Sequence, residues 1–159
     1  MSKKKKMANT YNQCYIQLVF AVKCRQNLIT KNIREKVEKY ITGIIQQKNQ
    51  KLLAIYCNPD HIHILVSLDT KIAIADLVRD IKANSSKFIN ENKLTQKIFA
   101  WQEGYGSFSY SKKEISRVAI YIENQEEHHR KKSFKKEYIE LLQVHEIKYE
   151  ERYLFEFFE

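Results

Sequence analysis

The stretch that decides the fold is Asn58-Pro59-Asp60-His61-Ile62-His63-Ile64-Leu65-Val66-Ser67-Leu68. Its first three residues are strong turn formers, and β-rich runs lie on both sides of them, at residues 52–57 and 61–68. Together they predict a β-hairpin. Because side chains alternate across a strand, the isoleucines at 62 and 64 share one face with Val66 and Leu68, while both histidines project from the opposite face. We therefore expect the apolar face to pack under helices and the histidine pair to be held on a rigid strand.

The rest of the chain supplies strands and helices around this hairpin. Apolar residues at three- and four-residue spacing predict helices, Thr30 is a candidate N-cap, and Ser111 with Glu114 matches a capping box. The expected elements are a strand at 15–22, a helix at 30–47, the hairpin at 52–57 and 61–68, a helix at 72–90, a strand at 98–110, a helix from 111 to about 125, and a helical run that includes Phe134, Tyr138 and Leu142. This order predicts an α+β fold, a ferredoxin-like (RRM-like) antiparallel sheet covered by helices.

Composition is typical of one ordinary globular domain. The 159 residues are 43% apolar and include three glycines and one proline. This content excludes disordered and collagen-like chains, and no run has the eighteen or so apolar residues of a membrane span. We expect a basic disordered tail at residues 1–8, a single domain at 9–153 and a C-terminal tail at 154–159.

Charge and cysteine content point to a polyanionic partner and a reducing compartment. The net charge is +9, and four of these charges come from the lysines at positions 3–6. Cys14, Cys24 and Cys57 are odd in number and share no C-x-x-C spacing, so neither a disulfide framework nor a zinc ribbon is expected. No apolar signal segment follows the basic start. We therefore expect a cytoplasmic protein without a membrane partner.

Two groups of side chains could carry chemistry. His61 and His63, two residues apart on a strand, suit a divalent metal, although the same spacing also fits two half-exposed histidines on a sheet; a third ligand would have to come from elsewhere. Tyr121 and Gln125, four residues apart on the expected helix, would place a phenol beside an amide. The chain has ten tyrosines, and spacing alone does not single out Tyr121. The pair at 128–129 is adjacent in sequence and surrounded by charges, and we interpret it as solvated.

Taken together, five motifs in order give the chain its resemblance to a known family. They are Leu18-Val19-Phe20-Ala21-Val22-Lys23-Cys24-Arg25, Asn58-Pro59-Asp60-His61-Ile62-His63-Ile64-Leu65, Ile81-Lys82-Ala83-Asn84-Ser85-Ser86-Lys87-Phe88-Ile89-Asn90, Trp101-Gln102-Glu103-Gly104-Tyr105-Gly106 and Tyr121-Ile122-Glu123-Asn124-Gln125-Glu126-Glu127-His128-His129. Over residues 12–153 the chain resembles the HUH single-tyrosine transposases of the insertion sequence 200/605 type, which act on single-stranded DNA. Cys24 is a departure, because the family more often has an aromatic or small residue there.

The resemblance implies a role for each residue of the catalytic set. Tyr121 would be the nucleophile on a C-terminal catalytic helix, and His61, His63 and Gln125 would bind Mg²⁺ or Mn²⁺. The reaction it implies is metal-assisted transesterification through a 5′-phosphotyrosine intermediate, which cleaves and rejoins single-stranded DNA at insertion-sequence ends. It also implies recognition of subterminal hairpins and a homodimer, since one tyrosine makes one covalent link and a full cycle handles two DNA ends.

The expected DNA contacts rest on charge alone. Lys23 and Arg25 follow the first strand, and Arg79, Lys82 and Lys87 lie on the polar face of the helix at 72–90. For each of them, ordinary surface charge is an equally good explanation.

Three alternatives share parts of this pattern. An RNA-binding module would use the same fold, but the chain lacks the glycine- and aromatic-rich signature of such modules, and His61 and His63 would have no role. An HUH nicking protein would cut without transposing, although relaxases usually place the tyrosine before the histidine pair. A domesticated repeat-associated transposase would share the chemistry and differ in substrate.

Overall fold

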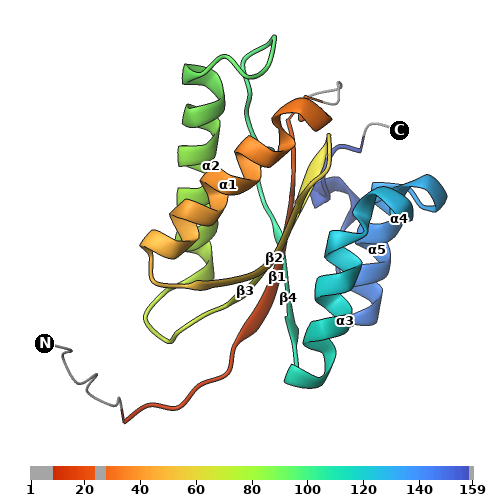
Figure 1. The fold of residues 1–159 in the computed structure, drawn as a ribbon. Coiled ribbons are helices and arrows are strands. Elements are labelled where there is room, and N and C mark those ends of the chain that lie inside the picture. The colour runs from red at the N-terminus through yellow and green to blue at the C-terminus, as the bar shows by residue number, and fades with distance from the viewer. Residues whose placement is uncertain (1–8, 24–27, 158–159) are drawn as a thin grey trace, which may run out of the picture.

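A four-stranded antiparallel sheet separates two layers of helices in the computed structural model, which describes residues 9–23 and 28–157 (Figure 1). The strands are β1 (Tyr15–Ala21), β2 (Lys51–Cys57), β3 (His61–Ser67) and β4 (Gly106–Tyr110), in the order β2-β3-β1-β4. Helices α1 (Lys31–Gln47) and α2 (Ile74–Glu91) cover one face, and α3 (Lys112–Glu123), α4 (Gln125–Lys131) and α5 (Phe134–Val144) cover the other. The predicted ferredoxin-like α+β fold is confirmed.

The register of the central strands places the predicted apolar face in the main core. Ile62, Ile64 and Val66 are fully buried with residues of α1 and α2. On the same strand, His63 is paired with Val19 of β1 and with Tyr56 of β2, so both neighbours fix its position. The histidine pair therefore lies on the other face of the sheet, under α3, α4 and α5.

A second, smaller cluster fastens α3 to that face. It contains Leu65 of β3, Ala54 of β2, and Val118 and Ile122 of α3. The predicted capping box is present at the start of α3, where the Ser111 and Glu114 side chains each accept from the other's backbone N–H. Tyr121 therefore lies on a capped helix that few buried residues attach to the sheet.

Two predicted boundaries are wrong. The strand expected at 98–110 begins only at Gly106; before it, Trp101 makes a single bridge to Val22 and its indole Nε1 donates to Ser85 Oγ. The helix expected to reach Gln125 ends at Glu123, and the charged stretch after it forms α4. Asn124 adopts φ −99° and ψ 27° between the two helices, and asparagine tolerates such helix-end conformations well.

The chain after α5 returns to the domain. Phe155 is buried against Phe134 and Tyr138, and Gln102 exchanges hydrogen bonds with the backbone of Glu156. Residues 154–157, expected to form part of a tail, are therefore packed. The predicted tail at 1–8 and Cys24 lie outside the described residues, while Cys14 and Cys57 are free thiols. None of the described helices is long and apolar enough to span a bilayer.

Candidate active site

His61 and His63 are the fixed part of the site. Their side chains are 1% and 0% exposed, so the alternative of two half-exposed histidines is wrong. His61 Nδ1 donates to Asp60 Oδ1 at 2.7 Å, and its ring stacks on Phe134 with centroids 3.7 Å apart. His63 Nδ1 lies 2.8 Å from Gln17 Nε2. Each imidazole is thus oriented through Nδ1, and both Nε2 atoms face the helices.

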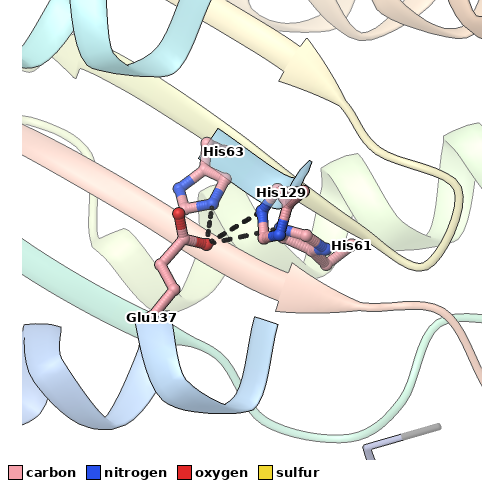
Figure 2. Close-up of side chains that lie close together, drawn as sticks. All are labelled: His61, His63, His129 and Glu137. Atoms are coloured by element: carbon pink, nitrogen blue, oxygen red, sulfur yellow. Dashed lines mark hydrogen bonds and ion pairs between the residues drawn. The ribbon is translucent and has the colours of Figure 1, made fainter. Parts of the chain in front are cut away.

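Glu137 of α5 is the residue on which the site converges. Its carboxylate is 2% exposed, and Oε1 lies 2.9 Å from His63 Nε2, 3.5 Å from His61 Nε2 and 3.4 Å from His129 Nε2. Figure 2 shows the three rings pointing toward this one carboxylate. The interpretation of the 128–129 pair as solvated is therefore wrong for His129.

Sequence patterns indicate both Glu137 and His129, although neither was among the predicted site residues. Glu137 occupies the inward stripe of α5 together with Phe134, Tyr138 and Leu142, and an acid on an apolar stripe needs a buried partner. His129 follows Gln125 by four residues, the spacing that places two side chains on one helix face.

Tyr121 and Gln125 meet on the other oxygen of the same carboxylate. The Tyr121 hydroxyl donates to Glu137 Oε2, and Gln125 Nε2 donates to the same oxygen at 3.3 Å. Gln125 is fully buried, and its Oε1 accepts from Asn58 Nδ2 at 3.2 Å and lies 2.9 Å from His129 Nε2. The structure therefore brings together the four residues predicted to be catalytic, while their roles stay predictions.

Burial and charge act in opposite directions across the cluster. Burial by itself raises the pKa of Glu137, but the surrounding imidazoles outweigh burial and hold that pKa well below its usual range. Burial lowers the pKa of His61, yet Asp60 and Glu137 outweigh it and raise the pKa above its usual value. Burial prevails at His63 and lowers its pKa. Burial and the Glu137 anion raise the pKa of Tyr121 far above 10, so the phenol keeps its proton at neutral pH.

Two cavities reach the cluster. One of about 430 Å³ lies between α3, β4 and α5, and its lining includes Tyr121, Glu137, Arg117 and Lys132. The other, of about 260 Å³, is lined by His129 with residues of α1 and of the β2–β3 turn. A ligand can thus approach the Tyr121 hydroxyl from the first side, where two basic residues can meet phosphate oxygens.

The residues predicted to contact DNA are not gathered at this site. Arg79, Lys82 and Lys87 lie on α2, across the sheet from Tyr121 (Figure 1). Arg79 and Lys87 pair with acids on their own helix, while Lys82 Nζ donates to the carbonyls of Gln102 and Gly104 at 2.9 and 2.6 Å. Lys23 is exposed, and Arg25 lies outside the described residues. Their contacts with DNA stay predictions.

The donor set fits a divalent cation beside a nucleophile. Imidazole nitrogens, a carboxylate and an amide oxygen are common ligands of Mn²⁺, Zn²⁺ and similar ions, and the hydrogen bond from His61 to Asp60 is the usual arrangement behind a metal-binding imidazole. The Tyr121 hydroxyl lies at the edge of this set, where it could attack a group held by the ion.

Comparisons with known proteins identify the family of the chain. Residues 10–125 match the family model described as "Transposase IS200 like". The ISDra2 transposase TnpA of Deinococcus radiodurans is 25% identical over 118 residues, covering 71% of this chain and 84% of that protein. The transposase of insertion sequence element IS200 from Salmonella typhimurium is 27% identical over 131 residues, covering 79% of this chain and 85% of that protein.

Two solved structures share the fold. A structure described as a candidate transposase from Deinococcus radiodurans R1 superposes with a TM-score of 0.61 at 21% identity, covering 77% of this chain and 98% of that one. A REP-associated tyrosine transposase superposes with a TM-score of 0.55 at 16% identity, covering 81% of this chain and 74% of that one. Since the family model covers well over half of its length, the chain belongs to the IS200-like transposases.

Proposed function

We propose that this transposase cleaves and rejoins single-stranded DNA at insertion-sequence ends through a covalent 5′-phosphotyrosine link to Tyr121. One observation carries the proposal. The Tyr121 hydroxyl and the Nε2 atoms of His61 and His63 meet on the two oxygens of a single buried carboxylate, that of Glu137. A nucleophile is thereby placed beside a group of metal-binding atoms, as a metal-assisted phosphoryl transfer requires.

The reaction moves one phosphodiester bond at a time. Tyr121 Oη attacks the scissile phosphorus, the bond from phosphorus to the 3′-oxygen breaks, and a free 3′-hydroxyl leaves with a proton. The new phosphotyrosine ester conserves the energy of the broken bond. The 3′-hydroxyl of another strand can therefore attack it, reseal the DNA and restore the tyrosine without ATP.

His61, His63 and Gln125 are the proposed ligands of Mg²⁺ or Mn²⁺. When bound, the ion would act as a Lewis acid on the scissile phosphate and orient it for in-line attack. The protein fixes the imidazole of His61 through Asp60, and it fixes the amide of Gln125 through Asn58. Both ligand atoms are therefore oriented before DNA arrives, which lowers the entropy cost of the reaction.

Glu137 directs the proton of the nucleophile. A phenol with a raised pKa is a poor nucleophile until its proton can leave, and Glu137 Oε2 accepts its hydrogen bond; because the lowered pKa of Glu137 makes it a weak base, the carboxylate relays this proton and does not hold it. In the reverse step the same oxygen is placed to return the proton to Tyr121.

The proposed substrate is single-stranded DNA with subterminal hairpins, handled by a homodimer. The REP-associated tyrosine transposase of similar fold was solved bound to a REP hairpin, which supports a hairpin substrate. Lys23, Arg25, Arg79, Lys82 and Lys87 are the proposed phosphate contacts. A dimer follows from the chemistry, because two DNA ends must be held when one tyrosine forms one link.

Formation of a covalent adduct tests the proposal. The protein is incubated with a labelled single-stranded DNA hairpin and Mn²⁺, and the products are separated on a denaturing gel. We expect a protein–DNA adduct that disappears in Tyr121→Phe while DNA binding is retained. Tyr40→Phe is the matched control, since Tyr40 lies on α1 across the sheet. An adduct that survives in Tyr121→Phe would show that another residue is the nucleophile.

A second strand in the same reaction separates transposition from nicking. If the protein is a transposase, a labelled acceptor with a free 3′-hydroxyl becomes joined to the DNA held on Tyr121. Adduct formation without joining would favour the nicking alternative.

A further inference from the structure

We infer that the metal centre takes two further protein ligands, His129 of α4 and Glu137 of α5, and that the resulting set favours Mn²⁺ over Mg²⁺. The inference rests on the proposed function, because it concerns the ion that would serve cleavage at Tyr121. Both residues lie beyond position 125, where the match to the family model ends.

Hydrogen bonding leaves two of the imidazoles with a lone pair aimed at the carboxylate. His61 Nδ1 carries a proton, since it donates to Asp60 Oδ1, and His129 Nδ1 carries one, since it lies 3.0 Å from the carbonyl oxygen of Lys132. In the neutral ring, Nε2 is then a bare acceptor. Asn58 Nδ2 lies 3.1 Å from His61 Nε2, as a donor to that lone pair would.

At His129 the lone pair of Nε2 would face hydrogen-bond acceptors only. Its Nε2 faces two oxygens, Gln125 Oε1 at 2.9 Å and Glu137 Oε1 at 3.4 Å. The Gln125 amide keeps its oxygen toward His129, because its nitrogen donates to Glu137 and its oxygen accepts from Asn58. A lone pair there would face two acceptors, so Nε2 must carry a second proton or share a metal ion with them, and a metal ion satisfies all three atoms at once.

The spacing of the donors matches a shared ion. Two ligands at about 2.1 Å from one tetrahedral ion lie about 3.4 Å apart. The three Nε2 atoms lie 2.9, 3.5 and 3.4 Å from Glu137 Oε1, and all four donors lie within 4.8 Å of one another. The His63 ring can join the set by carrying its proton on Nδ1 if the Gln17 amide rotates by half a turn. Its oxygen then faces His63, and its nitrogen donates to the Tyr110 hydroxyl, which now donates to Gln17 Oε1.

The chemistry of the set decides between the ions. Mg²⁺ prefers oxygen ligands and keeps several waters, whereas first-row transition ions, Mn²⁺ among them, accept imidazole nitrogen more readily. With the Gln125 amide oxygen, the set has three imidazole nitrogens and two oxygens, and its nitrogen content favours Mn²⁺ over Mg²⁺.

A titration of the full chain with Mn²⁺, without DNA, tests the inference. Bound Mn²⁺ is measured by loss of the free-ion electron paramagnetic resonance signal, and Mg²⁺ is added as a competitor. Replacing a residue that only orients a metal ligand weakens binding about 10- to 100-fold, so we expect at least this loss in Glu137→Gln and in His129→Ala. Mg²⁺ should displace Mn²⁺ only when present in large excess.

Matched controls come from the same helices. Glu140→Gln changes a half-buried acid one turn along α5, paired with Lys132, and His128→Ala removes the neighbouring imidazole of α4. Both controls should bind Mn²⁺ as the parent protein does. Circular dichroism confirms that each variant is folded.

The outcomes separate the inference from the proposed function. Unchanged or tighter Mn²⁺ binding in Glu137→Gln would overturn the inference, because the carboxylate would then compete with the ion instead of binding it. The absence of Mn²⁺ binding by the parent protein would overturn it as well. A Tyr121-dependent adduct beside unchanged Mn²⁺ binding in both variants leaves the proposed function standing and removes the inference alone. Weakened Mn²⁺ binding in both variants, with no adduct from the parent protein, supports the metal set and refutes the proposed function.

Discussion

Replacing Ile122 by alanine should weaken the docking of the helix that carries the nucleophile. Ile122 is fully buried, and it belongs to the small cluster that joins α3 to the sheet. Tyr121 is the preceding residue of the helix, and its hydroxyl donates to Glu137. The substitution therefore removes a buried contact of α3 and keeps every side chain of the proposed site, with the Tyr121 ring packed against the same cluster.

The magnitude follows from burial and from the size of the cluster. A buried Ile→Ala change costs about 2–5 kcal/mol, the sum of lost apolar transfer and of the cavity left behind. Ile122 is one of four buried members of the cluster, with Ala54, Leu65 and Val118, so its truncation removes a large share of the buried contacts of α3. Since every 1.4 kcal/mol is about tenfold in an equilibrium, a loss of about 2.8 kcal/mol makes the undocked helix roughly 100 times more common.

Ile41→Ala is the matched control. Ile41 of α1 is also fully buried, but it lies in the main core on the opposite face of the sheet. Urea unfolding followed by circular dichroism should show a loss of about 2–5 kcal/mol in both variants. At a temperature where both remain folded, single-turnover adduct formation should be at least about tenfold slower in Ile122→Ala than in Ile41→Ala. Equal rates of adduct formation in the two variants would show that Tyr121 can attack without α3 being docked on the sheet.

Three further outcomes follow from contacts of the site and its surroundings. Because folding lowers the pKa of Glu137, this residue stabilises the folded protein above about pH 4.5, and the stabilisation is lost as the pH falls below that value. Urea unfolding of the metal-free protein should show this loss of stability, and Glu137→Gln should show a smaller loss. Gly106→Ala should destabilise the fold by about 1–3 kcal/mol, because a Cβ there would lie 2.8 Å from Tyr138 Oη; thermal unfolding measures the shift, and an unchanged midpoint would mean that Tyr138 moves freely. The geometry indicates that the site acts within one chain, so a mixture of Tyr121→Phe and His63→Ala chains should form no more adduct than either variant alone. Adduct restored in the mixture would show that subunits exchange α3.

The hairpin and its histidines could be predicted because their signals are local. Turn chemistry at Asn58, Pro59 and Asp60 fixes where β3 starts, and strand alternation then fixes the face of every residue after it. The capping box that starts α3 is equally local. In each case neighbours in sequence determine the conformation.

Long-range contacts decided the features that were predicted wrongly or missed. A strand from residue 98 fitted the β-rich composition, but Trp101 turns its indole to Ser85 of α2, and regular pairing with β1 begins only at Gly106. Glu137 is brought to the histidines by the turn between α4 and α5, whose direction no periodicity gives. Its position on the apolar stripe of α5 predicted burial, though not the partners that burial would require.

The position of Glu137 also explains how the separate parts of the site depend on one another. Oε1 contacts the imidazoles of a rigid central strand, while Oε2 accepts from Tyr121 and Gln125 on helices with few anchors. A buried anion loses much of its stability when one donor leaves, so displacing any of these elements weakens the contacts of all the others. Tyr121 and the proposed metal ligands therefore depend on one another through Glu137, and Glu137 belongs to α5, which lies outside the segment matched by the family model.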